Sequence, residues 1–325
     1  MKRFAILFST LSLALMMVLA IGIYCIDPFN SGRSTLLSSD QIRQQGPRTA
    51  HAFRGRQPQF DGVIIGNSHV QLLSPERLTK GSSINFVSLT VPGTGPKEQL
   101  VMLDWFLRHR IRAPKTIVIG ADGYWCSADP NMTNWKPFPF WLYSTSPIEY
   151  VRGLMSFNSL EEAIVRLQFI LNPKNPARLD GYWDYEKDYT ALHDAIGTGK
   201  APNLDERKET ITPNISGRYP ALEALRDMLN RVPKTTGIFL VRPPVYITGL
   251  PIYGSAEAKT DANCLSEMMK LSAAHSQLTV LNWREERVEL KDKTLFFDHT
   301  HYRTNLALAI EEQISALIKA FRFDR

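Results

Sequence analysis

Five short apolar runs, separated by segments with helical character, constrain the fold of this 325-residue chain more than any other feature. Short apolar runs without alternation are typical of strands that are buried on both faces of a parallel sheet. Strands that alternate with helices predict an α/β domain with a mostly parallel, five-stranded sheet. The runs are Val63–Ile65, Ile84–Leu89, Thr116–Ile119, Gly237–Val241 and Leu278–Leu281.

The segments between these runs predict several helices. One helix is expected from Val70 to Leu78, and a second from Pro96 to Arg108, where proline suits the first helical position. A third is expected from Glu161 to Leu171, stopped by Asn172-Pro173. Near the C-terminus, apolar residues recur at helical spacing from Leu306 to Leu317.

The first predicted strand is followed by Gly66-Asn67-Ser68. Gly66 suits a sharp turn, and a serine between a strand end and a helix start exposes its hydroxyl near helix-terminal N–H groups. Such N–H groups can stabilise a developing oxyanion. Ser68 is therefore a candidate nucleophile, and the alternative that it only caps a helix N-terminus stays open at this point.

A second polar motif, Asp298-His299-Thr300-His301, precedes the C-terminal helical segment. In a turn, a carboxylate three residues before a histidine can fix the tautomer of that imidazole, and its second nitrogen is then available to a serine elsewhere. The simpler alternative is a capping aspartate with two surface histidines. A Gly-x-Ser after the first strand and an Asp-x-x-His before the last helix are unlikely to coincide by chance.

Gly66-Asn67-Ser68-His69 resembles the first block of SGNH/GDSL hydrolases, and Asp298-x-x-His301 resembles their last block. The order of these two blocks along the chain resembles that of the membrane-anchored branch of the family, which is similar to the alginate O-acetylation proteins and the teichoic-acid D-alanylation factor. The resemblance implies a three-layer, flavodoxin-like fold and a triad of Ser68, His301 and Asp298. It also implies that the backbone N–H of Gly93 or Gly95 helps to bind the oxyanion.

Several positions around these motifs are candidates for the site. Asp122 stands where the family has an asparagine that donates to the oxyanion, and an ionised carboxylate cannot donate. Asp122 can instead orient a neighbour or contact an acceptor hydroxyl. Arg242 follows the fourth strand and is a candidate clamp for an anionic or glycan group, or a solvated loop residue. His69 and His299 are expected to be neighbours of the site.

The N-terminus predicts a membrane segment. Lys2 and Arg3 precede an uncharged run from Phe4 to Ile26, which is long enough to span a bilayer as a helix. Because the run continues past a candidate cleavage site, we expect a retained signal anchor over residues 1–26. Together with the resemblance, this predicts a single-pass protein of the inner membrane with its catalytic domain in the periplasm.

The rest of the chain divides into three parts. Residues 27–59 are expected to form a linker with at most one short helix, and residues 60–325 a single α/β domain. An aromatic-rich insertion at about residues 124–219 interrupts that domain. It is interpreted either as a lid or cleft wall that stacks on sugars, or as a small helical subdomain with its own core.

Cysteine content and charge limit the remaining possibilities. Cys25 lies in the membrane segment, so Cys126 and Cys264 are the only possible disulfide partners, and two free buried thiols are an equal alternative. The net charge of +6 suits anionic lipids or acidic polymers, but no basic run indicates nucleic acid binding. Neither a metal site nor a nucleotide cofactor is expected, because no second ligand cluster and no Gly-rich fingerprint appear.

The sequence thus predicts acyl transfer or acyl-ester hydrolysis of O-acetyl type on a cell-envelope polysaccharide. The resemblance also suggests a membrane-bound acyl-exporting partner. Two alternatives remain: a non-catalytic envelope assembly or glycan-binding protein that keeps the fold, and a lipid esterase.

Overall fold

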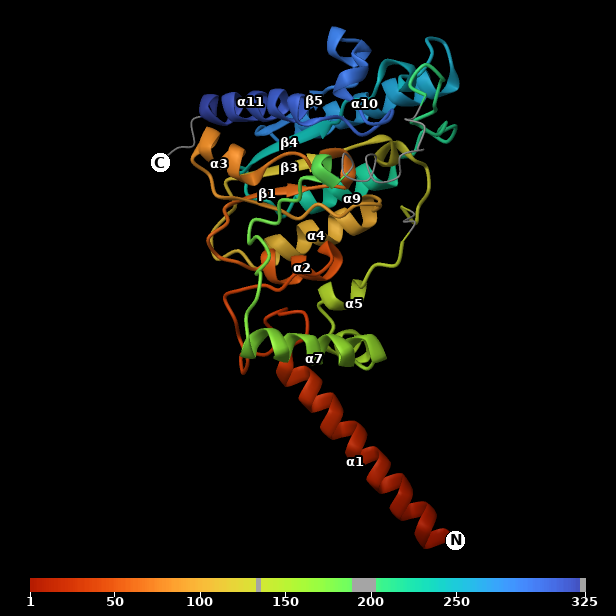
Figure 1. Cartoon of the computed structure of the whole chain (residues 1–325). Coiled ribbons are helices and arrows are strands. Elements are labelled where there is room, and N and C mark those ends of the chain that lie inside the picture. Colours follow the sequence, from red (N-terminus) through yellow and green to blue (C-terminus); the bar gives the residue numbers. More distant parts are fainter. Residues whose placement is uncertain (133–135, 189–202, 322–325) are drawn as a thin grey trace. The chain divides into compact units, whose positions relative to one another are not determined.

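The computed structural model describes residues 1–132, 136–188 and 203–321 (Figure 1). The chain forms two compact units, each built from two separate segments. Unit 1 consists of Met1–Arg56 and Phe138–Leu179, and unit 2 of Gln57–Pro137 and Asp180–Arg325. Unit 2 contains the sheet, whereas unit 1 contains the long N-terminal helix.

The sheet of unit 2 has five strands in the order β2-β1-β3-β4-β5, and every neighbouring pair is parallel. This confirms the predicted five-stranded parallel sheet. Val63 of β1 pairs with Ile117 of β3, which pairs with Ile238 of β4. The strands are β1 (Gly62–Ile65), β2 (Phe86–Ser88), β3 (Thr116–Gly120), β4 (Gly237–Arg242) and β5 (Leu278–Asn282).

The strands differ in how much of their length is buried. All residues of β1, β3 and β4 are buried, because these inner strands are covered on both faces. Of the two edge strands, β2 is buried throughout, whereas β5 exposes part of its length. The apolar runs that predicted the inner strands are therefore a direct consequence of burial on both sides.

Helices form the outer layers of unit 2. α3 (Pro75–Ser82) packs against α11 (Thr304–Ala320), and Figure 1 shows both across the sheet from α4 (Pro96–Arg108) and α9 (Pro220–Leu229). α9 contacts α4 and also α10 (Ala256–Ala274), which packs on β5. The bounds of α4 are those predicted, with Pro96 at its first position. The layers confirm the expected α/β class.

The segment after β1 differs from the prediction. The expected helix from Val70 to Leu78 is replaced by a short 3-10 turn, η1 (Ser68–Val70), and α3 starts only at Pro75. Val70, Leu72 and Leu73 are all fully buried, which a single regular helix face does not allow for this spacing. The Ser74 side chain accepts from Arg77 N at 3.3 Å and caps the delayed helix.

Four other short 3-10 turns occur in the loops of unit 2. They are η2 (Gly123–Cys126), η3 (Ile247–Gly249), η4 (Val288–Lys291) and η5 (Lys293–Leu295).

Unit 1 contains α1 (Lys2–Ile26), α2 (Pro47–Arg54), α5 (Phe140–Tyr143), α6 (Pro147–Leu154) and α7 (Phe157–Leu171). Within the described residues, α1 is the one helix whose length and composition would let it cross a membrane, with a mean hydropathy of 2.5. This confirms the predicted long apolar helix. α7 ends at Leu171 as expected, but starts earlier, because Ser156 caps it by accepting from Ser159 N.

The two segments of unit 1 are joined by polar contacts. Arg166 Nε donates to the Ile26 carbonyl at 2.9 Å, and Tyr143 OH donates to the Arg48 carbonyl at 2.6 Å. Ala177 N donates to the Ile42 carbonyl at 2.8 Å. The segment after α1 therefore folds together with residues 138–179.

Candidate active site

Ser68, His301 and Asp298 form a continuous hydrogen-bonded chain in unit 2. His301 Nε2 lies 2.9 Å from Ser68 Oγ, and His301 Nδ1 lies 2.8 Å from Asp298 Oδ2. Ser68 follows β1, while the other two residues lie in the loop before α11. The fold thus brings together the two sequence motifs at the carboxyl edge of the sheet, where parallel α/β sheets place their ligand sites.

Two glycines make room for the turn that carries Ser68. A Cβ atom on Gly66 would lie 2.3 Å from Val70 Cγ2, and one on Gly120 would lie 2.5 Å from the same atom. Val70 is fully buried against the ends of β1 and β3. Glycine at both positions lets Val70 pack there, and this packing holds the turn that presents Ser68.

The loop that carries His301 is closed on itself. Phe297 N donates to the His301 carbonyl at 2.8 Å, and Phe296 pairs with Tyr302 in an antiparallel bridge. Inside this loop, Asp298 Oδ1 accepts from the backbone N–H of Thr300 at 2.7 Å and of His301 at 2.9 Å. The carboxylate therefore organises the loop and also orients the imidazole.

The environment of Asp298 keeps its carboxyl group ionised. Burial opposes the charge, but the hydrogen bond and charge of His301, with the backbone N–H groups of Thr300 and His301, hold the pKa of Asp298 well below its usual range. An ionised carboxylate only accepts, so His301 Nδ1 carries the proton towards it. His301 Nε2 is then a proton acceptor that faces the Ser68 hydroxyl.

Backbone N–H groups lie beside the serine. Gly93 lines the same pocket as Ser68 and has a φ of 66°, a left-handed conformation that favours glycine. Within the described part of the chain, the N–H groups of Ser68 and Gly93 donate to no acceptor. The N–H of Gly95, in contrast, donates to Glu98 Oε2 at 2.9 Å. Ser68 and Gly93 thus supply two available donors.

Asp122 is an acceptor in this site. It is 3% exposed, and its Oδ2 accepts from Asn67 Nδ2 at 2.6 Å and pairs with His69 Nδ1 at 2.8 Å. Its Oδ1 accepts from Tyr124 N at 3.0 Å. Asp122 therefore orients its neighbours. The ring of His69 meets that of His301 edge to face, with 5.1 Å between centroids.

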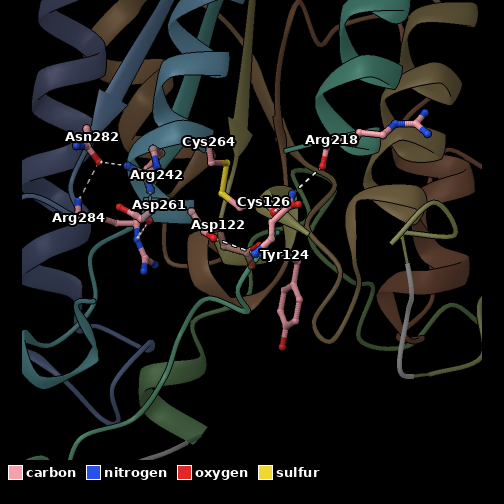
Figure 2. Close-up of a disulfide and its surroundings, with 11 residues drawn as sticks. Asp122, Tyr124, Cys126, Arg218, Arg242, Asp261, Cys264, Asn282 and Arg284 are labelled. Atoms are coloured by element: carbon pink, nitrogen blue, oxygen red, sulfur yellow. Dashed lines mark hydrogen bonds and ion pairs between the residues drawn. A yellow bond between two sulfur atoms is a disulfide. The ribbon is translucent and has the colours of Figure 1, made fainter. Parts of the chain in front are cut away.

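The structure does not bring Arg242 into the pocket. Its side chain is 1% exposed and donates from Nη1 to Asn282 at 2.9 Å and from Nη2 to Asp261 at 2.5 Å (Figure 2). Arg284, two residues beyond β5, lines the pocket instead. Its Nη2 donates to Thr210 Oγ1 at 2.8 Å, and its Nε lies 3.3 Å from Asp261 Oδ1.

Two buried arginines thus share the single carboxylate of Asp261. Burial lowers the pKa of Arg284 to about 10; the charges of Asp261 and Asp122 raise it, and that of Arg242 lowers it further. Burial likewise lowers the pKa of Arg242, against the opposing effect of Asp261. Arg284 therefore remains a cation at neutral pH and gives one wall of the pocket a positive charge.

The pocket has a volume of about 490 Å³, which lies in the range of sites for small ligands. The predicted residues Ser68, His301, Asp298, Gly93 and Asp122 all line it. Other lining residues are His69, Tyr124, Lys208, Glu209, Thr210, Ile211, Thr212, Pro243, Pro244, Val245 and Arg284. Across the described ranges, no cluster of three or more His, Cys, Asp or Glu residues is suited to hold a metal ion.

A disulfide supports one side of the site. Cys126 and Cys264 are bonded, which settles the open choice between a disulfide and two free thiols (Figure 2). The bond joins η2, which follows Asp122, to α10, which carries Asp261. Cys25 is the free cysteine.

Sequence reasoning missed some residues of the pocket. Arg284 and Tyr124 come shortly after the ends of strands. The expectation that ligand sites lie at the carboxyl ends of parallel strands, which identified Arg242 and Asp122, therefore applies to them as well. Burial, followed by the charge of Asp122, raises the pKa of Tyr124 to about 12. Residues 208–212 follow no strand, and nothing in the sequence marks them. His299 lies outside the pocket, with its Nε2 2.7 Å from the Glu206 carbonyl oxygen.

No protein-family model matches the chain, and no curated protein matches it either. The parallel sheet of order 2-1-3-4-5 is consistent with flavodoxin-like and SGNH folds.

Proposed function

We propose that this protein is an SGNH-type serine enzyme that transfers or hydrolyses acyl esters, of O-acetyl type, on a cell-envelope polysaccharide. The observation that carries the proposal is the chain from Ser68 Oγ through His301 to Asp298, beside a pocket at the carboxyl edge of the sheet. Three side chains from two distant motifs meet with the contacts that a nucleophile, a base and its orienting carboxylate require.

The first half-reaction forms an acyl-enzyme. Ser68 Oγ attacks the ester carbonyl carbon while its proton passes to His301 Nε2. The N–H groups of Ser68 and Gly93 stabilise the negative charge on the carbonyl oxygen. When the tetrahedral intermediate collapses, the ester C–O bond breaks and the leaving alkoxide takes the proton from His301.

The second half-reaction releases the acyl group. Water or a sugar hydroxyl gives its proton to His301 Nε2 and attacks the acyl carbon. The bond to Ser68 Oγ then breaks, and the serine recovers the proton from His301. Water as acceptor gives hydrolysis, and a sugar hydroxyl gives transfer.

The helix and the disulfide support an extracytoplasmic location. α1 has the length and composition of a membrane anchor or a signal sequence, and the Cys126–Cys264 disulfide suits an oxidising compartment. We place α1 in the inner membrane as a single-pass anchor, with Lys2 and Arg3 in the cytoplasm and the catalytic domain in the periplasm. A membrane-bound acyl-exporting protein is the proposed partner.

One observation favours a second candidate, a non-catalytic assembly or glycan-binding protein. Asp122 occupies the position of the family's oxyanion asparagine, and its carboxylate is engaged by Asn67, His69 and Tyr124. Loss of one oxyanion donor typically lowers kcat by about 10²–10³-fold. A site with two donors therefore reacts more slowly, or has become a binding site.

The test uses the full chain in detergent with a fluorophosphonate probe and with p-nitrophenyl acetate. We expect labelling and turnover in the wild type, and loss of both in Ser68→Ala and in His301→Ala with unchanged circular dichroism. Ser276→Ala, at an exposed serine, is the matched control and should behave as the wild type. A folded wild type that neither labels nor turns over the ester would contradict the enzyme and favour the binding protein.

A further inference from the structure

The C-terminal end of α1 is held by two helices of the same unit. Arg166 of α7 donates from Nε to the carbonyl of Ile26, the last residue of α1, and from Nη2 to the Leu37 carbonyl at 2.8 Å. The ring of Tyr24 meets that of Tyr150 in α6 edge to face, with 6.2 Å between centroids. Figure 1 shows α7 running across this end of α1. α6 and α7 therefore lie where α1 ends.

α7 exposes large apolar side chains in one line. Phe157, Ile164 and Leu171 are 75%, 51% and 85% exposed. Residues seven apart lie on nearly the same side of an α-helix, so these three form one stripe. The side that packs against the protein carries Ser159, Ala163, Arg166 and Phe169, and all four are buried.

α6 repeats this arrangement. Ile148, Val151 and Met155, the residue that ends the helix, are 79%, 45% and 49% exposed, at the spacing of one helix face. α6 and α7 pack against each other and against α1. Single exposed apolar residues are ordinary, but two neighbouring helices that both expose a stripe indicate an interaction surface. The apolar platform is defined as Ile148, Val151, Met155, Phe157, Ile164 and Leu171.

The surroundings of the apolar platform indicate a lipid partner. Arg152 of α6 and Lys174, just beyond α7, are exposed cations that suit anionic headgroups. On α7, Gln168 and Glu161 follow the apolar stripe around the exposed side, and Val165, which is 43% exposed, and Asn158 lie beyond them, so this side is mainly polar outside the stripe. Tyr24 lies near the end of α1, where spanning helices often place aromatic residues.

We infer that the apolar platform lies on the outer surface of the membrane that α1 spans. Its six side chains then enter the boundary between headgroups and acyl chains, and Asn158 faces water. The inference rests on the proposed role of α1 as an anchor, because a spanning α1 brings the helices at its end to the bilayer surface. The occupant of the platform is phospholipid.

The test measures depth in the bilayer with single fluorescent labels. The full chain carries Cys25→Ser, so that one added cysteine takes an NBD label while Cys126 and Cys264 stay bonded. The added cysteines are Leu13→Cys in α1, Ile164→Cys in the apolar platform and Asn158→Cys as the matched control on α7. Each protein is reconstituted into vesicles of phosphatidylethanolamine and phosphatidylglycerol, with or without brominated acyl chains.

We expect quenching by brominated lipid at Leu13 and at Ile164, and quenching at Ile164 about two-fold or more stronger than at Asn158. Quenching at Leu13 alone would leave the anchor in place and overturn the inference, and a protein partner would then be the cover of the platform. Equal quenching at Ile164 and Asn158 would overturn the orientation of α7. No quenching at Leu13 would reject the anchor, and the inference with it.

Discussion

At the scale of single residues, Asp298 both organises the loop that carries His301 and orients the imidazole of His301. We predict that Asp298→Asn lowers kcat for p-nitrophenyl acetate by about 10³–10⁴-fold, because an amide that donates to His301 Nδ1 moves the imidazole proton to Nε2. His301 could then no longer accept the proton of Ser68. Circular dichroism checks that the variant folds, and a kcat within tenfold of the wild type would contradict the assigned role.

Acid unfolding of the same variant supplies a second readout. Since the pKa of Asp298 is lower in the folded chain than in the unfolded one, this carboxylate stabilises the fold above the unfolded pKa, about 3.9. That stabilisation is lost as the pH falls through the lowered, folded-state pKa. The difference in free energy of unfolding between wild type and Asp298→Asn should therefore be largest near neutral pH and shrink in acid.

Asp122 permits a direct test of the position where the family has asparagine. Asp122→Asn restores the family's residue, but it replaces one acceptor oxygen with a donor nitrogen. This nitrogen would face a donor of Asn67, His69 or Tyr124 and could not accept its hydrogen bond. We predict a free energy of unfolding lower by about 1–3 kcal/mol, measured in urea, and no gain in esterase turnover. Asp227→Asn, at an exposed aspartate, is the control. A faster variant would show that the carboxylate merely replaces an oxyanion donor.

The same residues show how far single-residue reasoning reaches. Ser68, Asp298 and His301 were identified because each follows an apolar strand or precedes a periodic helix in a recognisable pattern. Arg242 is the last residue of β4 and Arg284 follows β5, and the sequence does not reveal that Asp261, from α10, pairs with Arg242 in the interior. Partners of this kind come from distant elements, so they could not be predicted.

At the scale of elements, the contact between β3 and the turn after β1 determines how Ser68 is presented. We predict that Gly120→Ala costs about 1–3 kcal/mol, since its Cβ would lie 2.5 Å from Val70 Cγ2. It should also slow the esterase, because Val70 is two residues after Ser68. Combining it with Val70→Ala should recover part of both losses.

A double-mutant cycle in urea measures this coupling, which we expect to be about 1–2 kcal/mol. Strictly additive losses would show that Gly120 and Val70 do not interact as the structure indicates.

The prediction of elements succeeded where burial leaves a simple pattern. All five strands were found because short runs made mostly of apolar residues have few other uses. The helix predicted from Val70 to Leu78 was wrong over its first half, because Val70, Leu72 and Leu73 are buried around an irregular segment whose shape depends on the neighbouring strands. Periodicity describes regular elements and gives no account of such turns.

At the scale of the molecule, the disulfide connects residues that are 138 positions apart. We predict that Cys126→Ser with Cys264→Ser destabilises the fold by about 4 kcal/mol, because the unfolded chain gains the freedom of a large loop. The melting temperature should fall by roughly 8–16 °C. Dithiothreitol should lower the wild type to the same value and leave the variant unchanged. Equal melting temperatures of variant and oxidised wild type would contradict the expectation.

The α/β class and the N-terminal helix were predicted because composition and alternation are properties of the whole chain. The division into two units was not, since unit 1 depends on contacts such as Arg166 with Ile26 and Tyr143 with Arg48. The first contact joins residues 140 positions apart and the second joins residues 95 positions apart, beyond the range of local patterns.

The discontinuous build of unit 1 also bears on proteolytic release. The chain passes between the units at residues 56–57, 137–138 and 179–180. A cut at 137–138 or at 179–180 leaves Ser68 on the same covalent piece as α1, whereas a cut at 56–57 leaves residues 1–56 held only by their contacts with residues 138–179, such as Arg166 with Ile26 and Tyr143 with Arg48. A secreted enzyme that is joined to its anchor by one flexible linker is released by one cut, whereas here the folded contacts within unit 1 would still hold residues 1–56 to the rest of the protein after a cut at 56–57.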